Sequence, residues 1–256
     1  MKQKPTFLHQ NKPMITAQVQ AANPERLLQL VRTAAQQGCD AFGFQMEKME
    51  EQYRTEKALR PAFEAMRGKP IYATNYRCAH NEGKSDDVLA QGYMWMLETM
   101  GATLIDVLGD LYCPSKHEIT YDAAAIEKQK ALVEKIHKAG GEVLMSSHTF
   151  TFMTAEEVLA IARAHQSRGA DISKIVTAAN SEEEELENLK TTALLRRELD
   201  IPFLFLSVGS HVHLHRTVGP ALGSCMWLTV AEYDELATTA QPLLSAVRAI
   251  SDGLII

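Results

Sequence analysis

Eight short apolar segments recur along this chain, and each is followed by a longer polar or amphipathic stretch. The segments are MITAQVQ (14–20), DAFGFQM (40–46), PIYATNY (70–76), TLIDVLG (103–109), EVLMSSH (142–148), DISKIVT (171–177), PFLFLSV (202–208) and SCMWLTV (224–230). The stretches between them include the helix-like 24–38 and 123–141, and Glu183 to Arg197 has the acidic start and basic end that a helix dipole favours. This alternation predicts an α/β fold, a (β/α)8 TIM barrel that forms a single domain over 1–256. A doubly wound open sheet fits less well, because no GxGxxG or GxxxxGKS/T motif follows any segment.

The overall charge and the absence of long apolar runs restrict the possible partners. A formal net charge of −6 argues against nucleic acid or an anionic membrane surface. No apolar run approaches the roughly 20 residues of a membrane span. The N-terminal MKQKPTFLHQNKP lacks the apolar core of a signal peptide, and the four cysteines have no CxxC spacing. We therefore expect a cytoplasmic metabolic protein with reduced thiols and a small-molecule partner.

One lysine lies within a segment that reads as a buried strand. In DISKIVT, Lys174 shares a strand face with Ile172 and Val176. A buried ammonium is unfavourable, so this lysine is paired, solvated by a cavity, or driven towards the neutral amine. Two readings of Lys174 are equally good: it is paired with a strand-end carboxylate, or it is activated as a nucleophile. A neutral amine attacks ketones and aldehydes to form a Schiff base.

A histidine ends the preceding strand. His148 closes the segment EVLMSSH, and the active sites of such barrels lie at the C-terminal ends of the strands. An imidazole there is suited to remove and return a proton near neutral pH. Because the fifth and sixth strands of a barrel are neighbours, His148 and Lys174 are expected to reach the same small molecule.

Four stretches resemble one enzyme family in the order that the family has them. SSHTF…T and GADISKI resemble the S-x-H-D-F…T-P and G-A-D-x-x-K-I patterns of the type I 3-dehydroquinate dehydratases. LSVGSHVHLHRTVGPALGS resembles M-S-M-G-x-x-G-x-x-S-R…G-S, and ATTAQPLLSAVRAI resembles the S-A-P-G-Q lid with the last helix. The resemblance covers nearly the whole chain.

The resemblance implies a homodimeric barrel lyase of the shikimate pathway that converts 3-dehydroquinate to 3-dehydroshikimate. No metal or organic cofactor is implied. Lys174 would match the Schiff-base lysine, and His148 the general base and acid. Arg216 would match the arginine that binds the substrate carboxylate by its planar fork, and Gln241 the lid glutamine that closes over it.

The residues that read the substrate hydroxyls differ from the family pattern. Where the second strand of the family ends in E-x-R-x-D, this chain has Gly43, Gln45 and Glu47. The D-x-E of the fourth strand becomes Asp106 followed by Leu108, which removes a carboxylate. A site that loses such partners loses much of its discrimination.

The end of the third strand can be aligned with the family in two ways. The family has T-F-R and then E-G-G, whereas this chain reads TNYRCAHNEGK. Alignment on Thr74 puts Tyr76 at the arginine, while alignment on Arg77 needs one extra residue and leaves Glu82 at the glutamate. We prefer the second alignment, so Arg77 and Glu82, with Gln45, are expected to bind substrate.

Other readings remain open at this point. A related Schiff-base lyase or aldolase acting on another keto-hydroxy carboxylate would keep the lysine and change the hydroxyl readers. A barrel retained only for binding would tolerate the same changes. His211, His213 and His215 alternate as zinc ligands do in an extended segment, which is the basis of a metal-dependent hydrolase reading. We expect no metal site.

Overall fold

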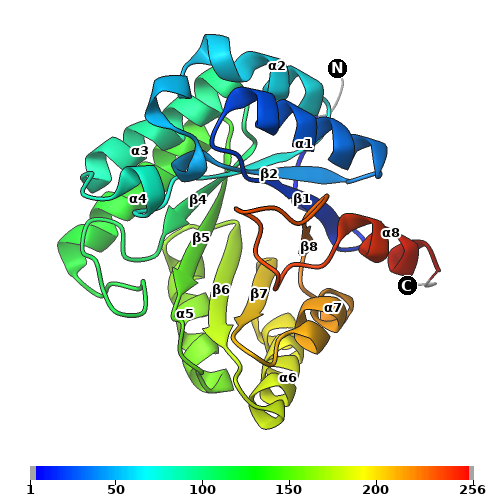
Figure 1. Ribbon diagram of the computed structural model, residues 1–256. Coiled ribbons are helices and arrows are strands. Elements are labelled where there is room, and N and C mark those ends of the chain that lie inside the picture. The colour runs from blue at the N-terminus through cyan, green and yellow to red at the C-terminus, as the bar shows by residue number, and fades with distance from the viewer. Residues whose placement is uncertain (1–3, 254–256) are drawn as a thin grey trace.

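All eight predicted strands form, within two residues of the predicted bounds, and their neighbours pair in parallel. The computed structural model describes residues 4–253. The strands are β1 (Met14–Val19), β2 (Ala41–Gln45), β3 (Ile71–Thr74), β4 (Leu104–Leu108), β5 (Glu142–His148), β6 (Ile172–Ala178), β7 (Phe203–Val208) and β8 (Met226–Thr229). The ladder runs β7-β6-β5-β4-β3-β2-β1-β8. The prediction of a (β/α)8 barrel is confirmed (Figure 1).

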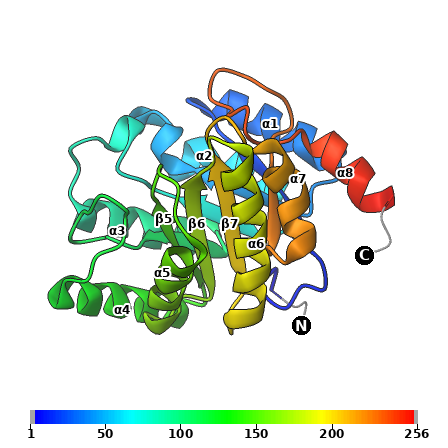
Figure 2. The same cartoon turned by 90° about the horizontal axis from the view of Figure 1, so that it is seen from below.

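Helices follow the strands and lie outside them (Figure 2). They are α1 (Pro24–Gln36), α2 (Glu56–Met66), α3 (Asp86–Trp95), α4 (Ala123–Lys138), α5 (Ala155–Ser167), α6 (Glu182–Glu198), α7 (His213–Leu222) and α8 (Leu244–Gly253), with short turns η1 (Met46–Lys48), η2 (Glu51–Tyr53), η3 (Ala79–Asn81) and η4 (Met96–Met100). Local chemistry sets several starts: Asn23 caps α1, and Thr154 with Glu157 forms a capping box on α5. Among the described residues, no helix is long and apolar enough to cross a membrane.

The ladder ends at β7 and β8, and a narrow junction between these two strands closes the barrel. β1 pairs with β8 over four residue pairs, from Met14↔Met226 to Ala17↔Thr229. At the β7 side, the Cys225 N–H donates to the Phe203 carbonyl at 2.8 Å. This bond lies at the start of both strands, so the barrel is drawn together at its floor.

An apolar layer fills the floor of the barrel. One inward-facing side chain from each strand joins Phe7, which is only 2% exposed, in this layer. The strand residues of the layer are Met14, Ala41, Tyr72, Leu104, Leu144, Ile172, Leu204 and Met226. Because side chains alternate along a strand, the residues two positions later face the same interior, nearer the mouth. Asp106, Ser146 and Lys174 occupy such positions, so they lie in the layer directly above the apolar floor.

Two buried histidines fasten helices to neighbouring elements. His165 of α5 is hydrogen-bonded to Ser147 of β5 and Ser173 of β6, both at 3.0 Å. His215 of α7 is hydrogen-bonded to Ser207 of β7 at 2.8 Å and to Thr192 of α6 at 2.9 Å. Burial lowers the pKa of each imidazole to about 3, so both are neutral in the folded protein.

We predict that these histidines make the fold sensitive to mild acid. Each has a folded pKa below its unfolded value near 6.5, so its contribution is fully present above pH 6.5 and is lost as the pH falls towards 3. Between pH 7 and pH 5 the free energy of unfolding should fall by about 2 kcal/mol per histidine. Urea unfolding at both pH values measures this loss.

His165→Gln is the variant that isolates one histidine, and the exposed His80→Gln is its control. His165→Gln should be less stable at pH 7 but lose less stability on acidification than the wild type. His80→Gln should follow the wild-type pH dependence. An unchanged dependence in His165→Gln contradicts the assignment.

Candidate active site

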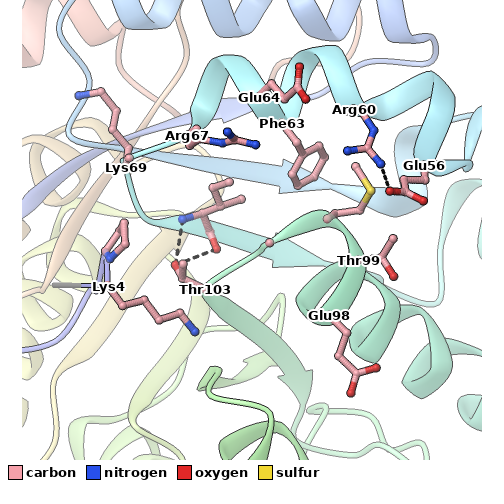
Figure 3. A pocket seen from close by; sticks show the side chains of 15 residues that line it. Lys4, Glu56, Arg60, Phe63, Glu64, Arg67, Lys69, Glu98, Thr99 and Thr103 are labelled. Carbon is pink, nitrogen blue, oxygen red and sulfur yellow. Dashed lines mark hydrogen bonds and ion pairs between the residues drawn. The ribbon is translucent and has the colours of Figure 1, made fainter. Parts of the chain in front are cut away.

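Two cavities lie at opposite ends of β3 and β4. The first, of about 360 Å³, is bounded by Ile71 and Thr103 at the N-terminal ends, and Arg60 is ion-paired with Glu56 in its wall (Figure 3). The second, of about 410 Å³, lies at the C-terminal ends, where Tyr76 and His148 are in its wall. Since barrel chemistry takes place at the C-terminal ends of the strands, the second cavity is the candidate active site.

Lys174 lies inside the barrel within a cluster of oxygen atoms. It is 5% exposed, and its strand β6 pairs with β5 through Ser146↔Lys174. The Nζ atom donates to the hydroxyl of Tyr76 at 2.5 Å and to that of Tyr72 at 2.9 Å. It also lies 3.2 Å from Oδ2 of Asp106 on β4. Three strands and the turn after β3 therefore converge on one amino group.

Asp106 is the charged partner of this lysine. Its side chain is fully buried, and both tyrosine hydroxyls and that of Ser146 donate to it. Burial raises the pKa of Asp106, but the charges of Lys174 and His148 and the hydrogen bonds from Ser146 and Tyr72 together hold it below its ordinary value. Burial and the Asp106 charge raise the pKa of both tyrosines well above the ordinary value. The phenols are therefore neutral donors.

The sequence left pairing and the neutral amine as equal readings of Lys174, and the structure has the amine paired. The carboxylate lies in the middle of the fourth strand, not at the strand end that the pairing reading named. Without ligand, the amine is held in an ion pair, which corresponds to the first of the two readings. Nucleophilic chemistry at Lys174 must begin with a proton transfer from Nζ to a group that touches it.

His148 ends β5 and is held by a carboxylate that the sequence did not single out. Its Nδ1 lies 2.6 Å from Oε2 of Glu118, which also accepts the His148 backbone N–H at 3.1 Å. Glu118 belongs to the loop between β4 and α4, where no motif or spacing marks it. Because Glu118 engages Nδ1, the other ring nitrogen, Nε2, is left for proton transfer.

Tyr76 connects the two predicted catalytic residues. Its ring lies edge-on to the imidazole of His148, with centroids 5.1 Å apart, while its hydroxyl contacts Nζ of Lys174. Lys174 itself is not part of the cavity wall, whereas Tyr76 and His148 are. Tyr76 therefore lies between the cavity and the amine of Lys174, and it borders both.

Arg77 and Glu82, expected to bind substrate, lie differently. Arg77 lines the cavity, but its guanidinium is bound to Asp86 at 2.7 Å and to Asp110 at 2.6 Å. Burial lowers the pKa of Arg77, and these two carboxylates more than offset it, so the pKa is raised. Glu82 is exposed beyond η3 and is not in the cavity wall. Tyr76, not Arg77, lies beside Lys174, which is the geometry of the alignment on Thr74.

The second strand has no side chain at Gly43, and Gln18 of the first strand occupies the space that one would take. A Cβ atom at Gly43 would lie 2.7 Å from Oε1 of Gln18 on β1. Gln18 is 4% exposed, and its Oε1 has no hydrogen-bond partner. Gln45, expected to bind substrate, lines the cavity, as does the fully buried Glu47. Burial raises the pKa of Glu47, which accepts hydrogen bonds from Thr74 at 2.9 and 3.0 Å.

Arg216 and Gln241 are buried, but neither lines this cavity. Arg216, 7% exposed in α7, donates from Nε to the Ser207 carbonyl at 2.7 Å. Among the described residues no carboxylate is paired with it, and burial lowers its pKa to about 10. Gln241 is 6% exposed, and its Oε1 has no partner. A buried guanidinium without a counter-ion is suited to receive an anionic ligand.

The alternating histidines do not form the zinc site of the hydrolase reading. α7 begins at His213, so His213 and His215 point about 200° apart around a helix. Both ring nitrogens of His215 are occupied by Ser207 and Thr192, and His211 is exposed. Within residues 4–253, no cluster of three or more His, Cys, Asp or Glu could hold a metal ion.

Comparisons with known proteins agree with this architecture. The 3-dehydroquinate dehydratase of Klebsiella pneumoniae is 28% identical over 193 residues, which cover 74% of this chain and 71% of that protein. That of Alkaliphilus oremlandii is 28% identical over 139 residues, 54% of this chain and 49% of the relative. The match to the Alkaliphilus protein thus spans about half of its length.

Solved structures show the same fold. The 3-dehydroquinate dehydratase of Geobacillus kaustophilus superposes with a TM-score of 0.78 at 19% identity, over 95% of this chain and 91% of that one. The type I enzyme of Clostridium difficile, with covalent modified comenic acid, gives 0.77 at 18% identity, over 95% and 92%. A family model described as type I 3-dehydroquinase matches residues 15–252. The chain therefore belongs to the type I 3-dehydroquinase family.

Proposed function

We propose that this protein is a carbon–oxygen lyase that converts 3-dehydroquinate to 3-dehydroshikimate through an imine on Lys174. The observation that carries the proposal is the single tyrosine, Tyr76, that contacts both the amine of Lys174 and the imidazole of His148. An imine-forming nitrogen and a proton-transfer group are thereby held at one end of one barrel. Family membership supports the same reaction.

The reaction assigns one role to each of the two residues. Condensation of Lys174 with the substrate ketone gives a protonated imine, which withdraws electrons and acidifies the adjacent C–H bond. His148, with Nδ1 held by Glu118, takes that proton at Nε2 and returns it to the departing hydroxyl. The hydroxyl leaves as water and the imine is hydrolysed, so no cofactor is consumed.

Arg216 and Gln241 are assigned to the substrate carboxylate. The guanidinium of Arg216 is buried without a carboxylate, and Gln241 has an unpaired amide oxygen. An incoming carboxylate would supply the missing counter-ion of Arg216. Binding of the substrate would draw the loop that carries Gln241 over the barrel mouth.

A second candidate function has the same Schiff-base chemistry and differs only in its substrate. The hydroxyl-reading side has lost charged groups, since Leu108, Gly43 and Tyr76 replace the Glu, Glu and Arg of the family pattern. This favours a Schiff-base lyase or aldolase acting on another keto-hydroxy carboxylate. The ratio of kcat/KM values for 3-dehydroquinate and for smaller keto-hydroxy acids decides between the two. A barrel retained only for binding would keep its ligand affinity in Lys174→Ala.

Assembly as a homodimer in the cytoplasm belongs to the same proposal. The family resemblance supports the homodimer, and the net charge of −6, which disfavours anionic surfaces, agrees with the cytoplasm. Light scattering of the purified protein tests the homodimer directly.

We predict that borohydride traps an adduct at Lys174 when 3-dehydroquinate is present. Lys174→Ala should trap nothing and form no enone by ultraviolet absorbance, while the exposed Lys190→Ala should match the wild type. His148→Gln should lose about 10²–10⁴-fold in kcat and still trap the adduct, because it lacks only the proton transfer. Peptide mass mapping locates the adduct. An adduct on another lysine, or none, contradicts the proposal.

We predict that Arg216→Lys raises KM by about 10- to 100-fold, because a point charge replaces a planar fork that would bind the carboxylate. The value of kcat should stay within about threefold, since this contact is made equally before and during the reaction. Steady-state kinetics and a thermal melt separate weaker binding from unfolding. Arg163→Lys, at an exposed surface pair with Glu198, is the matched control and should change neither parameter.

A further inference from the structure

Three groups surround the amine of Lys174, and one of them also faces the cavity. The groups that contact Nζ are the hydroxyls of Tyr72 and Tyr76 and the carboxylate of Asp106. Tyr72 and Asp106 are both 0% exposed. Tyr76 is partly exposed and forms part of the cavity wall. A ligand carbonyl that approaches the amine from this cavity therefore meets the hydroxyl of Tyr76.

Imine formation from a paired lysine requires protons to move from nitrogen to oxygen. An ammonium and a ketone give a protonated imine and water, so charge is conserved and two protons pass from Nζ to the departing oxygen. The group that carries them must accept from nitrogen and donate to oxygen within one contact. The hydroxyl of Tyr76 accepts from Nζ at 2.5 Å and donates its own proton to Asp106.

We propose that Tyr76 is a catalytic residue that relays protons from the Lys174 amine to the substrate carbonyl oxygen during imine formation. This inference rests on the proposed Schiff-base function. It separates two sets of proton transfers: Tyr76 and Asp106 serve the nitrogen and its carbinol oxygen, whereas His148 and Glu118 serve the carbon and the leaving hydroxyl.

The relay balances without any outside reagent. Nζ first gives one proton to Asp106, and the free amine attacks the carbonyl carbon. Tyr76 then protonates the new alkoxide and takes a proton from the nitrogen, which leaves a neutral carbinolamine. In the last step Tyr76 protonates the carbinol hydroxyl and recovers the proton held by Asp106. The C–O bond breaks as C=N forms, water departs, and Asp106 is again a carboxylate.

The raised pKa of the Tyr76 phenol agrees with this role, because the hydroxyl keeps its proton at neutral pH. The same holds for Tyr72, which makes it a matched control. Tyr72 has the same phenol, the same Asp106 partner and a contact of 2.9 Å to Nζ. It differs from Tyr76 in lying in the apolar floor layer, away from the cavity wall.

The experiment measures the rate of imine formation in His148→Gln, where elimination is blocked and the imine accumulates. Samples mixed with 3-dehydroquinate are quenched by borohydride at increasing times, and the Lys174 adduct is quantified. Adding Tyr76→Phe should slow adduct formation by about 10²- to 10³-fold, within the range of a positioned acid or base. Adding Tyr72→Phe should slow it less than tenfold. Equal losses in both variants, or no loss in Tyr76→Phe, would overturn the inference.

A second variant separates the relay from a structural role. In Tyr76→Ala with His148→Gln, added phenol should restore adduct formation in proportion to its concentration, and toluene should not. Rescue by both molecules would show that Tyr76 only fills space, which overturns the relay. If His148→Gln with its tyrosines intact gives no adduct with 3-dehydroquinate, the proposed function itself fails. If it gives an adduct and the Tyr76 variants are unimpaired, only the relay fails.

Discussion

The ion pair between Lys174 and Asp106 inside the barrel organises everything else at the mouth of this protein. A buried ammonium needs a charge partner and filled hydrogen-bonding directions, and two phenols with one carboxylate supply them. The apolar floor below excludes water from that side, which strengthens the pairing. In this ion pair the amine of Lys174 is held in its protonated form. Asp106, the base that can deprotonate it, is in direct contact with it.

Residues at different levels along the barrel axis have different roles. Residues near the floor are apolar and interlock, and residues two positions along the same strands carry charge. Helices outside are held to the strands by neutral histidines, each hydrogen-bonded on both ring nitrogens. Loops then add the final groups, of which Glu118 is the example, since a loop after β4 orients a histidine at the end of β5. Rigid strands position the nitrogen, and loops adjust the groups around it.

The sequence predicted the strands closely because alternation and length are local properties. It placed His148 because this residue ends its strand, and it placed Lys174 close by because the neighbours of each strand in a barrel are fixed by topology. It did not predict the partner of Lys174, because the choice among carboxylates depends on which strands converge. Glu118 could not be found, since a fourteen-residue loop has no period that aims its side chains. The preferred alignment of Arg77 failed for a similar reason: whether Tyr76 or Arg77 turns inward is decided by where β3 stops pairing, at Thr74.

The contact between Gly43 and Gln18 has an evolutionary consequence. The glutamine side chain occupies the volume in which any side chain at position 43 would begin. A side chain there would have to displace the amide end of Gln18, while shortening Gln18 alone would leave an unfilled hollow between two strands. The two positions are therefore coupled, because a carboxylate on the second strand at position 43 would require Gln18 to move or to be shortened.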